Sequence, residues 1–199
     1  MRIFDISQEI FSCAVYPGDP TPEKETVLAL DKGDVCNLTA FRMCAHNGTH
    51  VDAPYHFLKD GNTVEALPLH AVVGMAYVAE HSGDLTASDA QNIVARAALQ
   101  DEEAKKRILL KGNAVVTAEA AEVFVKEGVL LVGNESQTVG PENAPMQVHL
   151  LLLGAGVVLL EGVRLREVSQ GVYHLSAAPL ALGGADGAPC RAYLIDFEA

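Results

Sequence analysis

Residues able to bind metal ions gather in one short stretch of the chain. Three of the seven histidines, His46, His50 and His56, fall within residues 44–56, with Asp52 among them. Imidazole and carboxylate groups are the ligands that proteins use for Zn²⁺, Mn²⁺ or Fe²⁺. The stretch therefore indicates a metal site, and the alternative to weigh against it is an ordinary solvated polar turn.

The spacing within this stretch favours convergence of the side chains. His50 and Asp52 are two residues apart, so on an extended segment both point to the same side. His46 lies four residues before His50, also at even spacing, and can join that side if the chain stays extended or turns at Gly48. Pro54 excludes a regular helix here. We expect a strand that runs into a loop and brings several ligands together.

The hydrophobic pattern predicts the elements that would position this stretch. Predicted strands cover residues 2–6, 25–31, 35–44, 72–79, 107–111, 129–132, 157–161, 171–175 and 191–195. Predicted helices cover residues 88–99, 117–128 and 145–153. The second and third strands would form a hairpin across residues 31–34, which delivers the chain into the histidine stretch.

Alternation of strands and helices from residue 72 onward predicts parallel pairing with a right-handed crossover. Since strands outnumber helices and occur in both hairpin and β-α-β contexts, we predict a mixed α/β fold. The length of 199 residues suits a single domain spanning 1–199.

Composition limits the classes of partner. The net charge of −12 argues against nucleic acid and anionic membranes as partners. We find no signal peptide and no apolar run of membrane-spanning length. The four cysteines include no CxxC pair, which favours free thiols in a reducing cytoplasm over disulfides. Cys44 lies close to the histidines, and we interpret it as a small buried side chain rather than a ligand.

Two further polar residues interrupt apolar elements. His149 lies in the predicted helix 145–153, and Glu161 ends the predicted strand 157–161. A buried polar group without a partner costs roughly 1–3 kcal/mol, so each needs a partner or access to water. A core histidine bonded to a backbone carbonyl and a glutamate in water would satisfy this as well as a functional site. Periodicity alone leaves both interpretations open.

The pattern His46-x-Gly48-Thr49-His50-x-Asp52-x-Pro54-x-His56 resembles the signature of the cyclase-like metal-dependent hydrolases. That family includes bacterial kynurenine formamidase and isatin hydrolase. In its members a distal His, followed 12 residues later by a Glu, completes the signature, and His149 and Glu161 have this separation. The resemblance extends over essentially the whole chain and implies an α/β fold of the swivelling β/β/α type.

The resemblance also implies a ligand set for two divalent metal ions, either zinc or manganese. His46, His50 and Asp52 would hold one ion, and His149 would bind the second. Asp52 and Glu161 would be shared between the two ions.

Further roles follow from the same resemblance. His56 would be the proton donor and acceptor rather than a ligand. Tyr16 stands where formamidases have an aromatic substrate contact, which is typically Trp. Departures from the family pattern occur at Lys111-Gly112-Asn113 and Asn134-Glu135-Ser136, which we expect near the rim of the pocket.

The implied activity is hydrolysis of an amide C–N bond by metal-activated water. The named candidate is the arylformamidase reaction of tryptophan catabolism, N-formylkynurenine to kynurenine and formate. One alternative is hydrolysis of a cyclic amide or lactone such as isatin. Others are a metal-binding protein of this fold without turnover and a structural domain in which the cluster is incidental. The resemblance further implies a homodimer or larger assembly, such as a tetramer, with the Tyr16 loop near the subunit interface. The remaining histidines, His70, His81 and His174, are interpreted as structural.

Overall fold

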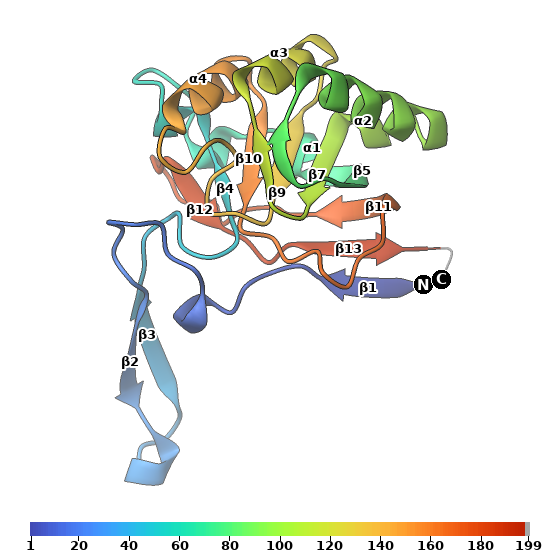
Figure 1. Cartoon of the computed structure of the whole chain (residues 1–199). Coiled ribbons are helices and arrows are strands. Elements are labelled where there is room, and N and C mark those ends of the chain that lie inside the picture. Colours follow the sequence, from blue (N-terminus) through green and yellow to red (C-terminus); the bar gives the residue numbers. More distant parts are fainter. Residues whose placement is uncertain (198–199) are drawn as a thin grey trace.

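A nine-stranded mixed sheet forms the centre of the molecule (Figure 1). The computed structural model describes residues 1–197. Along the sheet the strands follow the order β1-β13-β11-β5-β7-β9-β10-β4-β12. Their bounds are β1 Arg2–Asp5, β4 His50–Asp52, β5 Val73–Glu80, β7 Arg107–Lys111, β9 Leu131–Asn134, β10 Val158–Glu161, β11 Gly171–Ser176, β12 Gly187–Pro189 and β13 Tyr193–Asp196.

The middle of this sheet is parallel, as the β-α-β alternation predicts. Strands β5, β7, β9 and β10 pair in parallel. They are connected by α2 (Ala87–Gln100), α3 (Ala118–Lys126) and α4 (Met146–Gly154), which all cover one face of the sheet (Figure 1). Thr86 and Thr117 cap the first two helices, because each side chain accepts a hydrogen bond from a backbone N–H of the first turn.

Several short elements complete the fold. Strands β6 (Gly83–Leu85) and β8 (Ala114–Val116) form a small parallel sheet, and α1 (Leu69–Val72) is a single turn before β5. Short 3-10 helices cover Ile10–Ser12, Leu30–Lys32, Pro54–His56, Val64–Ala66 and Ala104–Lys106. Within residues 1–197, no helix combines the length and the apolar character needed to cross a membrane.

Apolar side chains pack on both faces of the parallel strands. On β7, Ile108 and Leu110 join the core beneath the helices, whereas Leu109 joins a second core on the opposite face. The helices enclose the first core, and β1, β11 and β13 bound the second (Figure 1). Burial on both faces explains why the parallel strands appear in the sequence as continuous apolar runs.

A β-hairpin arm projects away from this body (Figure 1). It consists of β2 (Glu23–Leu28) and β3 (Leu38–Arg42), which pair with each other in a separate two-stranded sheet. The predicted hairpin is confirmed, but its connection is longer than residues 31–34. The backbone N–H of Ala29 donates to Oδ2 of Asp34 at 2.8 Å, so a 3-10 turn and this side-chain bond close the loop.

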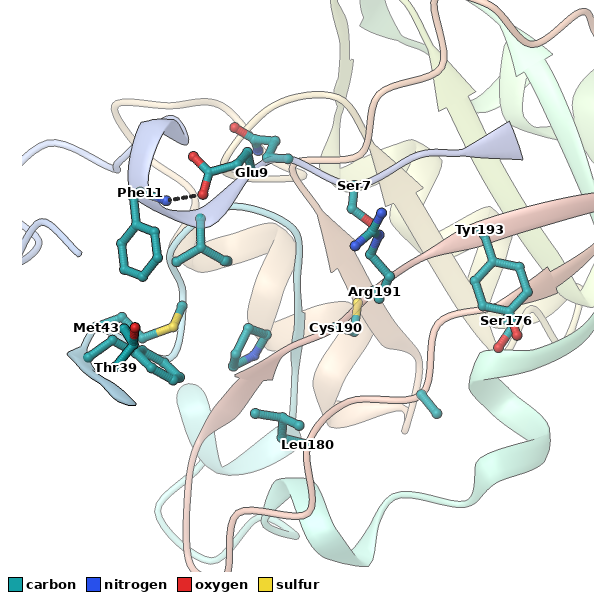
Figure 2. Close-up of a pocket in the computed structure, with 15 residues that line it drawn as sticks. Ser7, Glu9, Phe11, Thr39, Met43, Ser176, Leu180, Cys190, Arg191 and Tyr193 are labelled. Atoms are coloured by element: carbon teal, nitrogen blue, oxygen red, sulfur yellow. Dashed lines mark hydrogen bonds between the residues drawn. The ribbon is translucent and has the colours of Figure 1, made fainter. Parts of the chain in front are cut away.

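A largely apolar groove of about 850 Å³ lies between the base of the arm and the body. Figure 2 shows Phe11, Thr39 and Met43 on the arm side, and Cys190 and Tyr193 on the body side. The residues of the histidine stretch do not line this groove.

Candidate metal centre

Pairing of β4 with β10 aligns three of the expected ligands. His50 lies opposite Glu161, and Asp52 lies opposite Leu159. Val51 between them packs into the core on the far face of the sheet. The alternation of side chains along a strand therefore turns His50, Asp52 and Glu161 toward the face that the helices cover. The expected convergence of His50 and Asp52 is confirmed in the structure.

Gly48 and Thr49 hold the start of this strand. Gly48 has a positive φ of 67°, which makes the turn that its position predicts, and its carbonyl accepts from Nδ1 of His50 at 3.0 Å. The hydroxyl of Thr49 donates to the carbonyl of Gly162 at 2.8 Å, just after β10. These contacts tie the histidine stretch to the strand that carries Glu161.

His149 reaches the same place from α4. Its Nε2 lies 3.2 Å from Oε1 of Glu161 and 3.6 Å from Oδ2 of Asp52. Its Nδ1 donates to the carbonyl of Pro145 at 2.9 Å. The two interpretations left open by the sequence therefore both describe His149: one nitrogen bonds a backbone carbonyl, and the other faces buried carboxylates.

His46 and His50 approach the other side of these carboxylates. Nδ1 of His46 lies 2.9 Å from Oδ1 of Asp52, and Nε2 of His50 lies 3.4 Å from the same oxygen. Nε2 of His50 also lies 3.5 Å from Oε2 of Glu161. Each carboxylate thus presents one oxygen to the His46–His50 side and the other oxygen to His149.

The donor set suits metal ions. Within residues 1–197, Nε2 of His50 and Oδ2 of Asp52 are buried and have no hydrogen-bond partner. These two atoms lie within groups of His, Asp and Glu side chains whose ligand atoms are close enough together to hold an ion, so a bound cation would satisfy them. Imidazole nitrogens with carboxylate oxygens fit zinc and also manganese. Backbone carbonyls bonded to the opposite nitrogens of His50 and His149 would fix the ring orientation of each ligand.

The electrostatics of the cluster also favour a bound cation. Burial lowers the pKa of His46 and of His50, but the neighbouring carboxylates outweigh it and raise the pKa of each to about 10. Burial raises the pKa of Asp52, but the hydrogen bond with His46 and the nearby imidazole of His50 outweigh that effect and hold the pKa well below its usual range. The pocket of carboxylates therefore favours positive charge, which protons or metal ions can supply.

His56 lies beside the cluster, at the end of the 3-10 helix Pro54–His56. Its ring stacks on the ring of His46 with centroids 4.0 Å apart. Burial lowers the pKa of His56, so its imidazole is neutral near pH 7 and can accept a proton. Its Nδ1 lies 3.2 Å from Oδ2 of Asp186.

The sequence interpretation missed Asp186. The residue sits in the Gly-rich loop just before β12, and the same Oδ2 lies 2.9 Å from Nε2 of His46. A signal was present: Asp186 is the only acidic residue between Glu167 and Asp196. It could not be placed, because β12 itself was not predicted.

A cavity of about 240 Å³ opens over the cluster. Its lining includes His46, His50, His56, His149 and Glu161 together with Tyr16, Phe57, Gln137 and Thr138. The predicted aromatic residue Tyr16 thus borders this cavity, and its hydroxyl donates to the carbonyl of Glu142 at 2.7 Å.

Lys111 departs from the expected placement at the pocket rim. Its ammonium contacts Glu80 and the carbonyl of Val168 at 3.0 and 2.8 Å, and neither residue lines the cavity. Glu135 is also structural, because its carboxylate accepts from the N–H groups of Gly112 and Leu165. Asn134 and Ser136 lie near the rim, because both contact Thr138, which lines the cavity. The side chain of Asn134 donates to the carbonyl of Thr138, and Oγ of Ser136 accepts from its N–H.

Two other residues considered from the sequence lie outside the cluster. Cys44 contacts Asp19 through its Sγ at 3.8 Å rather than any of the ligands. His174 lies on β11, with its ring 6.1 Å from that of Phe197. Both residues therefore lie apart from the cluster, but Cys44 is half-buried rather than buried as expected.

Comparison with known proteins places the chain in a family. The family model described as "Putative cyclase" matches residues 4–141. The chain belongs to this cyclase family. The family resemblance in the signature and the predicted mixed α/β fold are thereby confirmed.

Similar proteins share nearly the full length of this cyclase-family chain. A kynurenine formamidase from Salinibacter ruber is 32% identical, with 98% of each sequence covered. A solved structure described as a potential metal-dependent hydrolase with cyclase activity is 27% identical, with a TM-score of 0.82 over 100% of this chain and 99% of that one. Isatin hydrolase A from Labrenzia aggregata has a TM-score of 0.80 over 97% and 93% of the two chains, and at 22% identity this likeness concerns the fold alone.

Proposed function

We propose that this protein is a metal-dependent hydrolase that cleaves the C–N bond of an aryl formamide, with N-formylkynurenine as the candidate substrate. The observation that carries the proposal is the pair of buried carboxylates shared between two sets of histidines, with His56 beside them at one cavity. Membership of the cyclase family and the name of the Salinibacter ruber relative support the same reaction.

The ligands would divide between two divalent ions, zinc or manganese. His46 and His50 would hold the first ion, and His149 would hold the second. Asp52 and Glu161 would each give one oxygen to either ion, which follows the division of their oxygens between the histidines. Bound together, two such ions supply activation of a water molecule and polarisation of the substrate carbonyl.

His56 would move the proton that hydrolysis requires. Water adds its oxygen to the carbonyl carbon, the C–N bond breaks, and the proton released by water passes to the leaving nitrogen. An imidazole that is neutral near pH 7 can accept this proton and then donate it to the amine. His56 can do so because it faces the cavity without lying between the shared carboxylates.

The cavity suits a compact substrate. Its volume of about 240 Å³ is below the range of about 300–1,000 Å³ that is usual for small-molecule sites. Tyr16 and Phe57 border it, so a single aromatic ring can lie against them while the amide points to the carboxylates. We propose Tyr16 as the aryl contact.

The test uses metal-free protein reloaded separately with Zn²⁺ and with Mn²⁺. Each preparation is given N-formylkynurenine, isatin and an aliphatic formamide, and formate or the ring-opened acid is measured. Turnover of the first compound well above the other two supports the proposal, and the more active preparation identifies the preferred metal. Turnover of isatin alone would replace the substrate assignment with a cyclic amide, and bound metal without any turnover would contradict hydrolysis.

We also propose that the protein is a homodimer formed through the hairpin arm. An isolated two-stranded hairpin is marginally stable in water, yet among residues 1–197 β2 and β3 pair only with each other. The arm exposes large apolar side chains, including Val35 at 94% and Phe41 at 58%. The same chain carries an apolar groove at the base of the arm, so a two-fold related copy can cover both surfaces (Figure 2).

Sedimentation over a range of concentrations tests the dimer. The wild-type protein is expected to sediment as a dimer, and the double variant Val35→Glu, Phe41→Glu as a monomer. Leu99→Glu is the control, since Leu99 is 87% exposed on α2 and lies outside the arm. A wild-type monomer at all concentrations would contradict the proposal, and a species of four chains would extend it to a tetramer.

We assign the protein to the cytoplasm. All four cysteines are free thiols, and burial raises the pKa of the Cys190 thiol to about 12, so this group is unreactive. The test isolates the protein from each cell fraction under alkylating conditions and counts its free thiols. Recovery from the cytoplasmic fraction with all four thiols free supports the assignment.

A further inference from the structure

A single carboxylate oxygen contacts two histidines that the reaction uses differently. Oδ2 of Asp186 lies 2.9 Å from Nε2 of His46 and 3.2 Å from Nδ1 of His56. His46 is an expected metal ligand, and His56 is the expected proton carrier. Asp186 is therefore the one described carboxylate in contact with both, although it lies outside the family signature.

The fold holds Asp186 in this place through its backbone. Strand β12 pairs antiparallel with β4, so Gly187 lies opposite Asp52. The carbonyl of Asp186 accepts from the N–H of Ala53 at 2.9 Å. A Cβ at position 187 would lie 2.7 Å from Cε1 of His46, so this glycine allows the loop to pass directly beneath the imidazole. Asp186 is thus anchored to the same strand that carries the ligands.

The contacts decide which nitrogen of each ring carries a proton. A carboxylate accepts hydrogen bonds, so both ring nitrogens that face Asp186 must be N–H donors. Nδ1 of His46 faces Oδ1 of Asp52 at 2.9 Å, so in the metal-free protein it carries a proton too. A metal ion bound there would displace that proton and leave Nε2–H toward Asp186. In neutral His56 the contact with Asp186 leaves Nε2 without a proton, on the opposite side of the ring from Asp186.

We propose that Asp186 is a positioning residue for the hydrolytic reaction, which orients His46 and His56 together through one oxygen. It holds His46 with Nδ1 toward the metal centre and holds His56 with Nε2 free to accept the proton from water. The rings of His46 and His56 stack with centroids 4.0 Å apart. The shared oxygen therefore fixes the position of His56, the proton carrier, relative to His46, the ligand of the first ion. This inference rests on the proposed hydrolase function for its kinetic consequences, but not for the ring tautomers.

The first experiment observes the rings directly. In ¹⁵N-histidine-labelled protein loaded with Zn²⁺, which is diamagnetic, His56 is expected to give the signals of a neutral Nδ1–H imidazole. In Asp186→Ala the Nδ1–H form of His56 is expected to give way to a mixture that contains Nε2–H. An unchanged tautomer in Asp186→Ala would overturn the proposal, whether or not the protein hydrolyses any amide.

The second experiment measures turnover and metal content. Loss of a partner that orients a ligand typically costs 10–100-fold, so Asp186→Ala is expected to lower kcat by about that factor with little change in KM. Asp186→Asn keeps one carbonyl oxygen as acceptor and is expected to recover part of the loss. Two metal ions per chain should remain bound in both variants. Loss of one ion from Asp186→Ala would make the residue a ligand and overturn its assignment as a positioning residue.

Glu65 offers a matched control. Its Oε1 accepts from the N–H of Gly184 at 2.9 Å, so it holds the same loop without contacting either imidazole. Glu65→Ala is expected to keep the His56 tautomer and wild-type kcat. An equal fall in kcat for Glu65→Ala and Asp186→Ala would show that loop position, and not the carboxylate, matters. If the wild-type protein has no activity, the proposed function fails and the NMR comparison alone decides the role of Asp186.

Discussion

Charged side chains are buried at two places in this molecule, and the two places differ in how completely these side chains are partnered. At the metal centre, Asp52 and Glu161 face three histidines, and Nε2 of His50 and Oδ2 of Asp52 remain without partners. At the start of β7, the buried guanidinium of Arg107 donates to the carbonyls of Ala71, Met75 and His70.

The difference distinguishes a site that can bind a ligand from a site that stabilises the fold. Arg107 meets carbonyls in and just after the short helix α1, whose C-terminal end attracts positive charge. Burial lowers the pKa of Arg107, but its donors have acceptors within the protein. At the metal centre, by contrast, Nε2 of His50 and Oδ2 of Asp52 lie near other charged groups but make no hydrogen bond within the described residues. These unpartnered atoms lie beside other metal-binding side chains, and that convergence is what indicates a ligand site.

Replacing a shared carboxylate should break the metal centre most severely. Asp52→Asn removes the charge that both sets of histidines approach, so both ions should bind weakly. We expect the loss of kcat/KM to exceed the 10–100-fold that is typical of outer partners. Metal analysis after dialysis, with kinetics, checks this, and Asp84→Asn on the exposed strand β6 is the control. Two ions per chain in Asp52→Asn would exclude the shared role.

Removing the proton carrier should damage turnover and spare the metal. His56→Ala is expected to keep two ions per chain and to lose about 10²–10⁴-fold in kcat, since that is the usual contribution of a general acid–base group. His70→Ala serves as the control histidine, because the side chain of His70 is outside the cavity. If His56→Ala loses an ion, the residue must be reassigned as a ligand.

Replacing Arg107 should change the stability of the protein and leave its metal content unchanged. Arg107→Leu removes the donor from one buried contact and two partly buried ones. An unsatisfied buried group costs about 1–3 kcal/mol, so the free energy of unfolding should fall by about 1–3 kcal/mol. Urea unfolding of the metal-free protein measures this fall. Arg107→Lys, which keeps one donor group, should lose less. A variant that binds fewer ions but unfolds normally would contradict the separation of the two places.

The smallest effect is a pH dependence that distinguishes the two places. Without metal, the folded pKa values of His46 and His50 are about 10, above the usual value of 6.5. A raised pKa contributes stability that is complete below pH 6.5 and is lost as pH rises toward 10. The metal-free protein should therefore lose stability between pH 6.5 and 10, and the metal-loaded protein much less. Arg107→Leu should keep this slope, and thermal unfolding across pH measures it.

The sequence predicted the parts of the metal centre that local patterns determine. Even spacing places His50 and Asp52 on one side of a strand. Local patterns predicted the helix of His149 and the strand of Glu161, but only the family resemblance connected these residues with the site. The sequence could not supply Asp186, because Gly-Ala-Pro has weak strand preference and β12 exists only through its pairing with β4. Lys111 was misplaced for the same reason, since its contact with Val168 depends on a distant loop.

The register of β4 between β10 and β12 has a consequence for how the molecule assembles. The side chains of the centre lie in segments more than 100 residues apart along the chain, from His46 to Glu161, and closing such long loops is slow. The ions can then bind strongly only after the far strands have docked, so they should select the finished sheet rather than nucleate it. Refolding with and without Zn²⁺ should therefore proceed at the same rate, while the added ion slows unfolding and so lengthens the life of the native state.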